Sequence, residues 1–150
     1  MSRSRWGPIT WFFLHSFAEL IPEKTFGENR DFIITSVTDI LGSLPCPTCS
    51  SHATKYLKSS SFSRIERRDH LKIWLHQFHN VVNRRLGKPE FSVEERDALY
   101  PRADIRKIYS EFKTIFGMKR ADNLMIDTRL RRLLLQRLDA WFAVWGGGFQ

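Results

Sequence analysis

Residues 67–86, RRDHLKIWLHQFHNVVNRRL, carry the strongest helical pattern in this chain. Apolar side chains recur there at steps of three and four residues, which places them along one face of an α-helix. The apolar residues are Leu71, Trp74, Leu75, Phe78, Val81, Val82 and Leu86. Gly87 and Pro89 follow directly, as is typical beyond a helix C-terminus. The stretch therefore predicts a buried helix that ends near residue 86.

The helical period extends over most of the chain, and no segment shows the alternating pattern of a β-strand. Pro8 suits the first turn of the first helix, and Pro22 ends that helix. We therefore expect an all-α bundle of about five to seven helices. The predicted helices cover residues 8–21, 28–41, about 47–57, 67–86, 105–116 and 126–145.

Length and charge limit the possible classes of protein. With 150 residues the chain can form one compact core, and a second full domain is not expected. The formal net charge of +8 suits a phosphate-bearing cofactor, an acidic protein surface or nucleic acid. No segment has the roughly 20 apolar residues of a membrane-spanning helix, and no signal-type apolar block follows the basic start. We therefore expect a soluble cytoplasmic protein without signal peptide or transmembrane segment.

The only two cysteines lie three residues apart, in LPCPTC at 44–49. A disulfide between Cys46 and Cys49 would close a loop too small to stabilise the fold. At the start of a helix, unpaired backbone N–H groups and the helix dipole lower the pKa of a thiol. The pair therefore suits cycling between dithiol and disulfide, and we interpret it as a catalytic redox couple.

Other interpretations of the cysteines stay open at this point. A zinc site could use Cys46, Cys49 and His52, but zinc sites usually have two tight ligand pairs, and no second pair is evident. A thioredoxin-like motif would need a βαβ unit. Two inert buried cysteines could also occur by chance, although Pro45 and Pro47 on either side of Cys46 argue against an accidental placement. The histidines that could supply a fourth zinc ligand are His70, His76 and His79.

A polar stripe shares the helix at 67–86, because its members are spaced three or four residues apart. Such side chains can hydrogen-bond to a flat heterocycle and stack on it. A solvated helix face is the simpler interpretation when composition alone is considered. The stripe consists of His76, His79, Asn80 and Asn83, and it is followed by cations that can meet a phosphate, Arg84, Arg85 and Lys88.

Three blocks occur along the chain: WGPITWFFLH at 6–15, LPCPTC at 44–49 and HNVVNRRLGKP at 79–89. In this order and spacing they resemble the Erv/ALR family of FAD-linked sulfhydryl oxidases. The resemblance is strongest to the compact viral members, as in poxviruses, African swine fever virus and iridoviruses. In those members CPxC is followed by His-Ala, similar to His52-Ala53 here. The resemblance covers about the first 90 residues.

The resemblance implies a four-helix bundle that binds FAD non-covalently, with a short fifth helix at 93–100. It implies an oxidase domain at 1–100, and it leaves 101–150 as a helical C-terminal extension. The redox couple would be Cys46 and Cys49, and no metal is implied. The residues implied to bind FAD are Gly7, Thr10, Trp11, His15, His79, Asn80, Val82, Asn83, Arg85 and Lys88, with Phe91 as a further contact.

The resemblance also implies the reaction and the partners. Cys46 would face the substrate, and Cys49 would face the flavin. Electrons from a dithiol protein substrate, or from a small dithiol electron-carrier protein, would pass through the disulfide to FAD and then to O2, which gives H2O2. Family members commonly dimerise through their first two helices, so we expect a homodimer. The expected location is the cytoplasm, of a host cell if the chain is viral, or the virion.

The extension carries an apolar helix stripe that needs a partner, because so wide a stripe is rarely left in water. It could pack on the oxidase domain, form the dimer interface or dock client proteins. Its arginines also allow a rival function, a basic nucleic-acid-binding helical module, although no nucleic-acid motif is recognised. A zinc-stabilised module is the other alternative. These arginines are Arg129, Arg131, Arg132 and Arg137.

Overall fold

The computed structural model describes residues 3–118 and 125–149, and over these ranges the chain forms helices and no strand. The predicted all-α fold is therefore confirmed. The α-helices are α1 (Arg3–Leu20), α2 (Glu23–Glu28), α3 (Arg30–Gly42), α4 (Pro47–Ser59), α5 (Arg68–Arg85), α6 (Val93–Leu99), α7 (Ile105–Phe116) and α8 (Met125–Trp145). Short 3₁₀ helices are η1 (Phe62–Arg64), η2 (Tyr100–Arg102) and η3 (Gly146–Gly148). No helix within the described ranges is long and apolar enough to cross a membrane.

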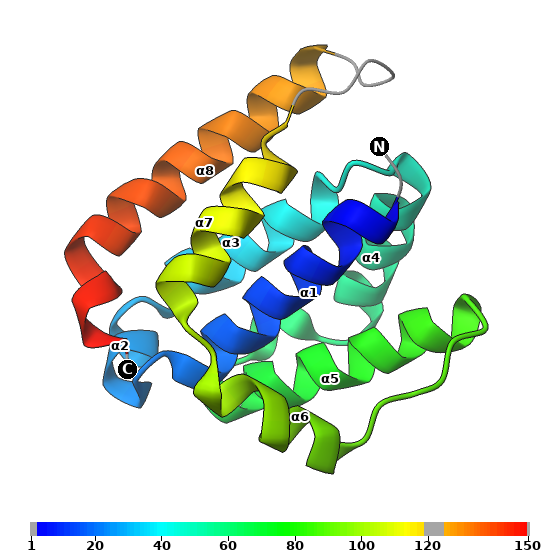
Figure 1. The fold of residues 1–150 in the computed structure, drawn as a ribbon, viewed down its shortest axis with the longest axis horizontal. Coiled ribbons are helices and arrows are strands. Elements are labelled where there is room, and N and C mark those ends of the chain that lie inside the picture. The colour runs from blue at the N-terminus through cyan, green and yellow to red at the C-terminus, as the bar shows by residue number, and fades with distance from the viewer. Residues whose placement is uncertain (1–2, 119–124, 150) are drawn as a thin grey trace.

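The helix α1 lies at the centre of the molecule and is covered on two sides (Figure 1). The helix α5 packs against one side of it and α7 against the other, while α3 contacts α4 and α8. Phe13, Phe17 and Ala18 of α1 are buried in the core between these helices. Burying a large apolar side chain stabilises a fold by roughly 1.5–3 kcal/mol, so α1 anchors the helices that surround the site.

Two helix boundaries near the N-terminus differ from the prediction. The helix α1 starts at Arg3, so Pro8 lies inside it and not in its first turn. At this position the proline has no N–H to donate to the carbonyl four residues before it. The predicted helix at 28–41 is preceded by a separate helix, α2, and α3 starts only at Arg30. This raises the number of α-helices in the described ranges to eight, one more than predicted.

Asn29 separates α2 from α3, with φ −122° and ψ 18°. Its side-chain N–H donates to the carbonyl of Thr25 at 2.9 Å. The indole N–H of Trp141 donates to its side-chain oxygen at 3.1 Å. Because this second partner lies 112 residues away in the sequence, local spacing could not predict the break.

The helix α5 ends in a Schellman motif that requires glycine. Gly87 has φ +71°, its N–H donates to the carbonyl of Arg84 at 3.2 Å, and the N–H of Lys88 donates to the carbonyl of Asn83 at 2.8 Å. A residue with a Cβ is strained in this left-handed conformation. The motif turns the chain from α5 into the segment 88–92 that leads to α6.

The two helices of the extension pack on α1 and α3. Phe112 of α7 stacks on Phe13 of α1, with ring centroids 4.5 Å apart. Trp141 of α8 stacks on Phe32 of α3 at 5.6 Å and an interplanar angle of 8°. These α1 and α3 surfaces belong to the first two predicted helices, through which we expected a homodimer.

Candidate active site

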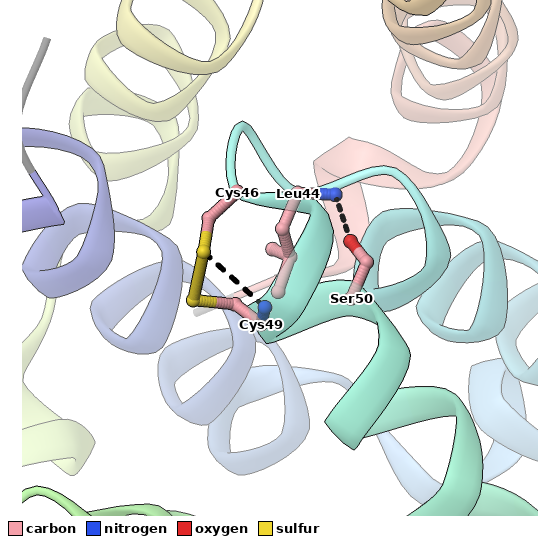
Figure 2. The surroundings of a disulfide bond; sticks show 4 residues. All are labelled: Leu44, Cys46, Cys49 and Ser50. Atoms are coloured by element: carbon pink, nitrogen blue, oxygen red, sulfur yellow. Dashed lines mark hydrogen bonds between the residues drawn. A yellow bond between two sulfur atoms is a disulfide. The ribbon is translucent and has the colours of Figure 1, made fainter.

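The site begins with the two cysteines, which form a disulfide with Cα atoms 5.2 Å apart (Figure 2). Cys46 is the N-cap of α4, and its sulfur accepts a hydrogen bond from the backbone N–H of Cys49 at 3.2 Å. Pro47 follows at the first helical position, where a missing N–H costs nothing. The N–H of Leu44 donates to the hydroxyl of Ser50 at 2.8 Å, which ties the preceding loop to α4.

A pocket of about 920 Å³ lies between α1, α4, α5 and the segment after α5. Cys49 lines this pocket, whereas Cys46 is not among the described residues that line it. The disulfide thus has one sulfur-bearing residue at the pocket and one beside it. Both cysteines are partly exposed.

The structure brings most of the predicted cofactor residues together at this pocket. They come from α1, from the last turns of α5 and from the segment after it, as the three sequence blocks implied. Those that line the pocket are Gly7, Thr10, Trp11, His79, Val82, Asn83, Arg85, Lys88 and Phe91. Their role in binding FAD stays a prediction.

His15 and Asn80 do not line the pocket, but each holds a residue that does. The side-chain amide of Asn80 donates to the carbonyl of Phe91 at 3.0 Å and accepts from its N–H at 2.9 Å. This pair of hydrogen bonds fixes Phe91 against α5. The Nε2 atom of the buried His15 lies 3.0 Å from Nδ1 of His79.

Stacked rings surround this histidine pair. Trp11 stacks on His79 with centroids 4.0 Å apart and an interplanar angle of 5°. Tyr100 stacks on the other histidine, His15, at 4.7 Å. Burial, followed by the charges of His76 and Lys88, lowers the pKa of His79 to about 4. Burial also lowers the pKa of His15 well below its usual value, so both rings are neutral at neutral pH.

The pocket suits FAD in size and chemistry. Its volume lies in the upper part of the range for small-molecule sites, roughly 300–1,000 Å³. Trp11, Phe78 and Phe91 supply aromatic surface for a flat heterocycle. The exposed cations Arg85 and Lys88 supply the positive charge that a diphosphate requires. The residues present therefore fit this cofactor.

Sequence reasoning missed several lining residues. Leu44 precedes the cysteines, Phe78 belongs to the apolar stripe of α5, and Tyr100 follows α6. For Phe78 a signal is present in the sequence, because it lies four residues before Val82 and so shares a helix face with this predicted cofactor residue. Nothing local to Tyr100 indicates that its ring reaches His15.

The alternative of a zinc site finds no set of metal ligands among the described residues. Across 3–118 and 125–149, no three His, Cys, Asp or Glu side chains come together in a way that could hold a metal ion. His52 lines the same pocket as Cys49, but its side chain is exposed.

Comparisons with known proteins define the class. The Erv1 / Alr family model matches residues 8–101. The chain is 34% identical over 92 residues to the FAD-linked sulfhydryl oxidase ERV1 of Arabidopsis thaliana, which covers 61% of this chain and 48% of that protein. It is 29% identical over 103 residues to the FAD-linked sulfhydryl oxidase of African swine fever virus (isolate Pig/Kenya/KEN-50/1950), covering 69% of this chain and 86% of the virus protein.

A third relative is the 347L protein of Invertebrate iridescent virus 6, 32% identical over 90 residues, with 56% of this chain and 81% of that protein covered. No solved structure gives a significant match. The chain spans about half of the Arabidopsis protein but most of the two virus proteins. It belongs to the Erv1/Alr family, as the three sequence blocks predicted.

Proposed function

We propose that the protein is an FAD-dependent thiol oxidase that forms disulfide bonds in dithiol substrates through the Cys46–Cys49 couple. Family membership and the names of the relatives support this class. The observation that carries the proposal is the disulfide itself, since only Cys49 of the two cysteines lines the pocket that fits FAD. An internal disulfide beside a cofactor pocket can accept an electron pair from one side and release it on the other.

The chain's own part of the reaction starts at Cys46. A substrate thiolate attacks the Cys46 sulfur, the Cys46–Cys49 bond breaks, and its electron pair leaves with Cys49 as a thiolate. The second substrate thiolate then attacks the substrate sulfur of the mixed disulfide and releases Cys46 as a thiolate. The substrate leaves as a disulfide, and the protein keeps the two electrons as a dithiol beside the pocket.

The pocket residues would hold FAD while this happens. Trp11, His79 and Phe91 would contact its flat rings, and Arg85 and Lys88 would meet its diphosphate. When bound, FAD accepts the two electrons and passes them to O2, which gives H2O2. His15 and Asn80 would act indirectly, because they orient His79 and Phe91.

Cysteine variants test the proposal. Wild-type protein should purify with FAD, consume O2 when given dithiothreitol and produce H2O2 in equal amount. We expect Cys49→Ser to keep the flavin absorbance and lose O2 consumption to the level of the buffer. When Cys46 of this variant is first converted to a mixed disulfide with 5,5′-dithiobis(2-nitrobenzoic acid), a substrate with a single cysteine should displace the thionitrobenzoate and stay bound to Cys46 as a mixed disulfide, visible by mass spectrometry.

Thr48→Ala is the matched control, because Thr48 is an exposed neighbour in the same motif. This variant should keep wild-type oxidase activity. Wild-type turnover by Cys49→Ser, or wild-type protein that takes up no FAD, would contradict the proposal.

The dithiol partner is a client protein or a small dithiol electron-carrier protein. We propose that either of them would approach Cys46 from the exposed side of its side chain.

The predicted homodimer also stays a proposal. Since α7 and α8 cover part of α1 and α3, a second copy must use another surface of these helices or of the molecule. Light scattering of the full chain would measure its oligomeric state in solution. The proposed location is the cytoplasm or, as for a viral chain, the virion.

A further inference from the structure

Arg131 of α8 is an unusual residue to find in the core. In the sequence it belongs to the group of arginines that could bind nucleic acid, yet its side chain is 1% exposed. Its Nη1 donates to the carbonyl of Ser43 at 3.1 Å, and its guanidinium lies 6.0 Å from the centre of the Phe116 ring. Its Nε and Nη2 atoms are buried and have no hydrogen-bond partner. Among the described residues no carboxylate forms an ion pair with it.

Such a residue is costly for packing alone. A buried charge without a close counter-charge is penalised, and an apolar side chain of similar volume often stabilises a fold more. The charge of Asp127 favours the cationic form of Arg131, but burial outweighs it and lowers the pKa. The position therefore suggests a role beyond filling space between α8, α7 and α3.

The Ser43 carbonyl connects Arg131 to the cysteines. Ser43 is the C-cap of α3, where unpaired carbonyls favour a cation, and Cys46 is the N-cap of α4 three residues later. Hydrogen bonds hold the segment between these two caps at two adjacent residues, Ser43 and Leu44. Arg131 binds the Ser43 carbonyl, and the hydroxyl of Ser50 binds the Leu44 N–H.

We propose that Arg131 is a positioning residue for the Cys46–Cys49 couple. By holding the Ser43 carbonyl it keeps the loop in the conformation in which the Cys46 sulfur accepts the Cys49 N–H. This hydrogen bond and the start of α4 stabilise a Cys46 thiolate in the reduced protein. This inference rests on the proposed function, in which the two cysteines are the redox couple. It concerns α8, which lies outside the family match at 8–101.

The test uses full-length protein reduced and then freed of reductant, and it measures the rate of Cys46 alkylation by iodoacetamide against pH. We expect Arg131→Met to slow alkylation near neutral pH by at least about threefold and to shift the pH profile upward, because the thiolate loses support. Thermal unfolding should show a midpoint equal to or above that of wild type, since a buried charge is removed. In the oxidase assay kcat/KM for dithiothreitol should fall by the same factor, with unchanged FAD content.

Arg137→Met is the matched control. Arg137 also joins α8 to α3, through an ion pair with Asp39 at 2.8 Å, but it does not bind the loop. Its alkylation profile should equal that of wild type. A wild-type profile in Arg131→Met overturns the inference.

Arg131→Lys keeps the buried charge but shortens the reach to Ser43, and we expect at least about a twofold slower reaction. If Arg131→Met does not fold, a wild-type profile in Arg131→Lys overturns the inference instead. Alkylation requires neither flavin nor O2. Absence of O2 consumption by wild-type protein would therefore defeat the proposed oxidase function and leave this comparison intact.

Discussion

At the scale of single residues, the neutral histidine pair is the feature with the clearest physical consequence. His15 and His79 share one N–H between Nε2 and Nδ1, so at least one ring is neutral, and the lowered pKa values of both rings keep the whole pair neutral at neutral pH. Burial favours this state because a charged imidazole would lose its hydration. The pair thus ties the pocket to the protonation state of two rings.

This linkage predicts acid sensitivity. Between about pH 6.5 and pH 4 the unfolded chain protonates these histidines while the folded chain does not, so the unfolded state binds more protons and stability falls as pH falls. For His79 the loss is at most about 3.5 kcal/mol. Thermal midpoints measured across this pH range should drop more steeply in wild type than in His79→Gln. Parallel curves would show that this histidine is not the titrating group.

At the scale of helices and loops, the segment after α5 is held from both ends. The Schellman motif at Gly87 fixes its start, and the two hydrogen bonds from Asn80 fix Phe91. Between these points lies Lys88, a lining residue of the pocket. A change at the start of the segment should therefore reach the pocket without touching it.

Gly87→Ala tests this arrangement. A Cβ at φ +71° should cost about 1–2 kcal/mol and lower the thermal midpoint by several degrees, with weaker FAD binding in equilibrium dialysis. Gly27→Ala is the control, since Gly27 lies in α2 and a Cβ there meets nothing within 4 Å. That variant should unfold at or above the wild-type temperature. Equal FAD affinity of wild type, Gly87→Ala and Gly27→Ala would show that the conformation at Gly87 does not affect the pocket.

Sequence reasoning reached the helices but not the side-chain contacts that join them. The period of three and four residues gave α5 and α8 because it reflects burial of one helix face. Asn80 is predicted to bind the cofactor, and in the structure it also hydrogen-bonds to Phe91, a contact with a residue eleven positions away that no spacing rule encodes. Arg131 could have been recognised, because it lies three and four residues before Leu134 and Leu135 on the buried face of α8. A pattern built from apolar residues alone leaves Arg131 out because it is charged.

At the scale of the whole molecule, the extension bears on how the chain unfolds. Trp141 of α8 contacts Phe17 of α1 and Phe32 of α3, so it joins residues 101–150 to the helices that carry the pocket. We propose that the two predicted parts, 1–100 and 101–150, unfold as one cooperative unit.

Trp141→Ala should therefore lower the stability of the pocket along with that of α8. Removing a buried tryptophan costs about 3–5 kcal/mol, which corresponds to a lower midpoint on the order of 10 °C. The midpoint temperature of helix loss, measured by circular dichroism, and that of flavin release, measured by fluorescence, should fall by the same amount. Val144→Ala, at a position 74% exposed on the same helix, should shift neither. Flavin release at the wild-type temperature in Trp141→Ala would mean that the extension is energetically separate.

The placement of one cysteine at the pocket and the other beside it has a consequence for selectivity. Under the proposed function, a folded client of any size could be oxidised, since it need only present a thiol to Cys46 and never has to enter the cavity. Bulk added to the flavin ring would instead have to be accommodated inside a volume of about 920 Å³. The protein would then accept client proteins of many sizes at Cys46 but only cofactors that fit the pocket at Cys49.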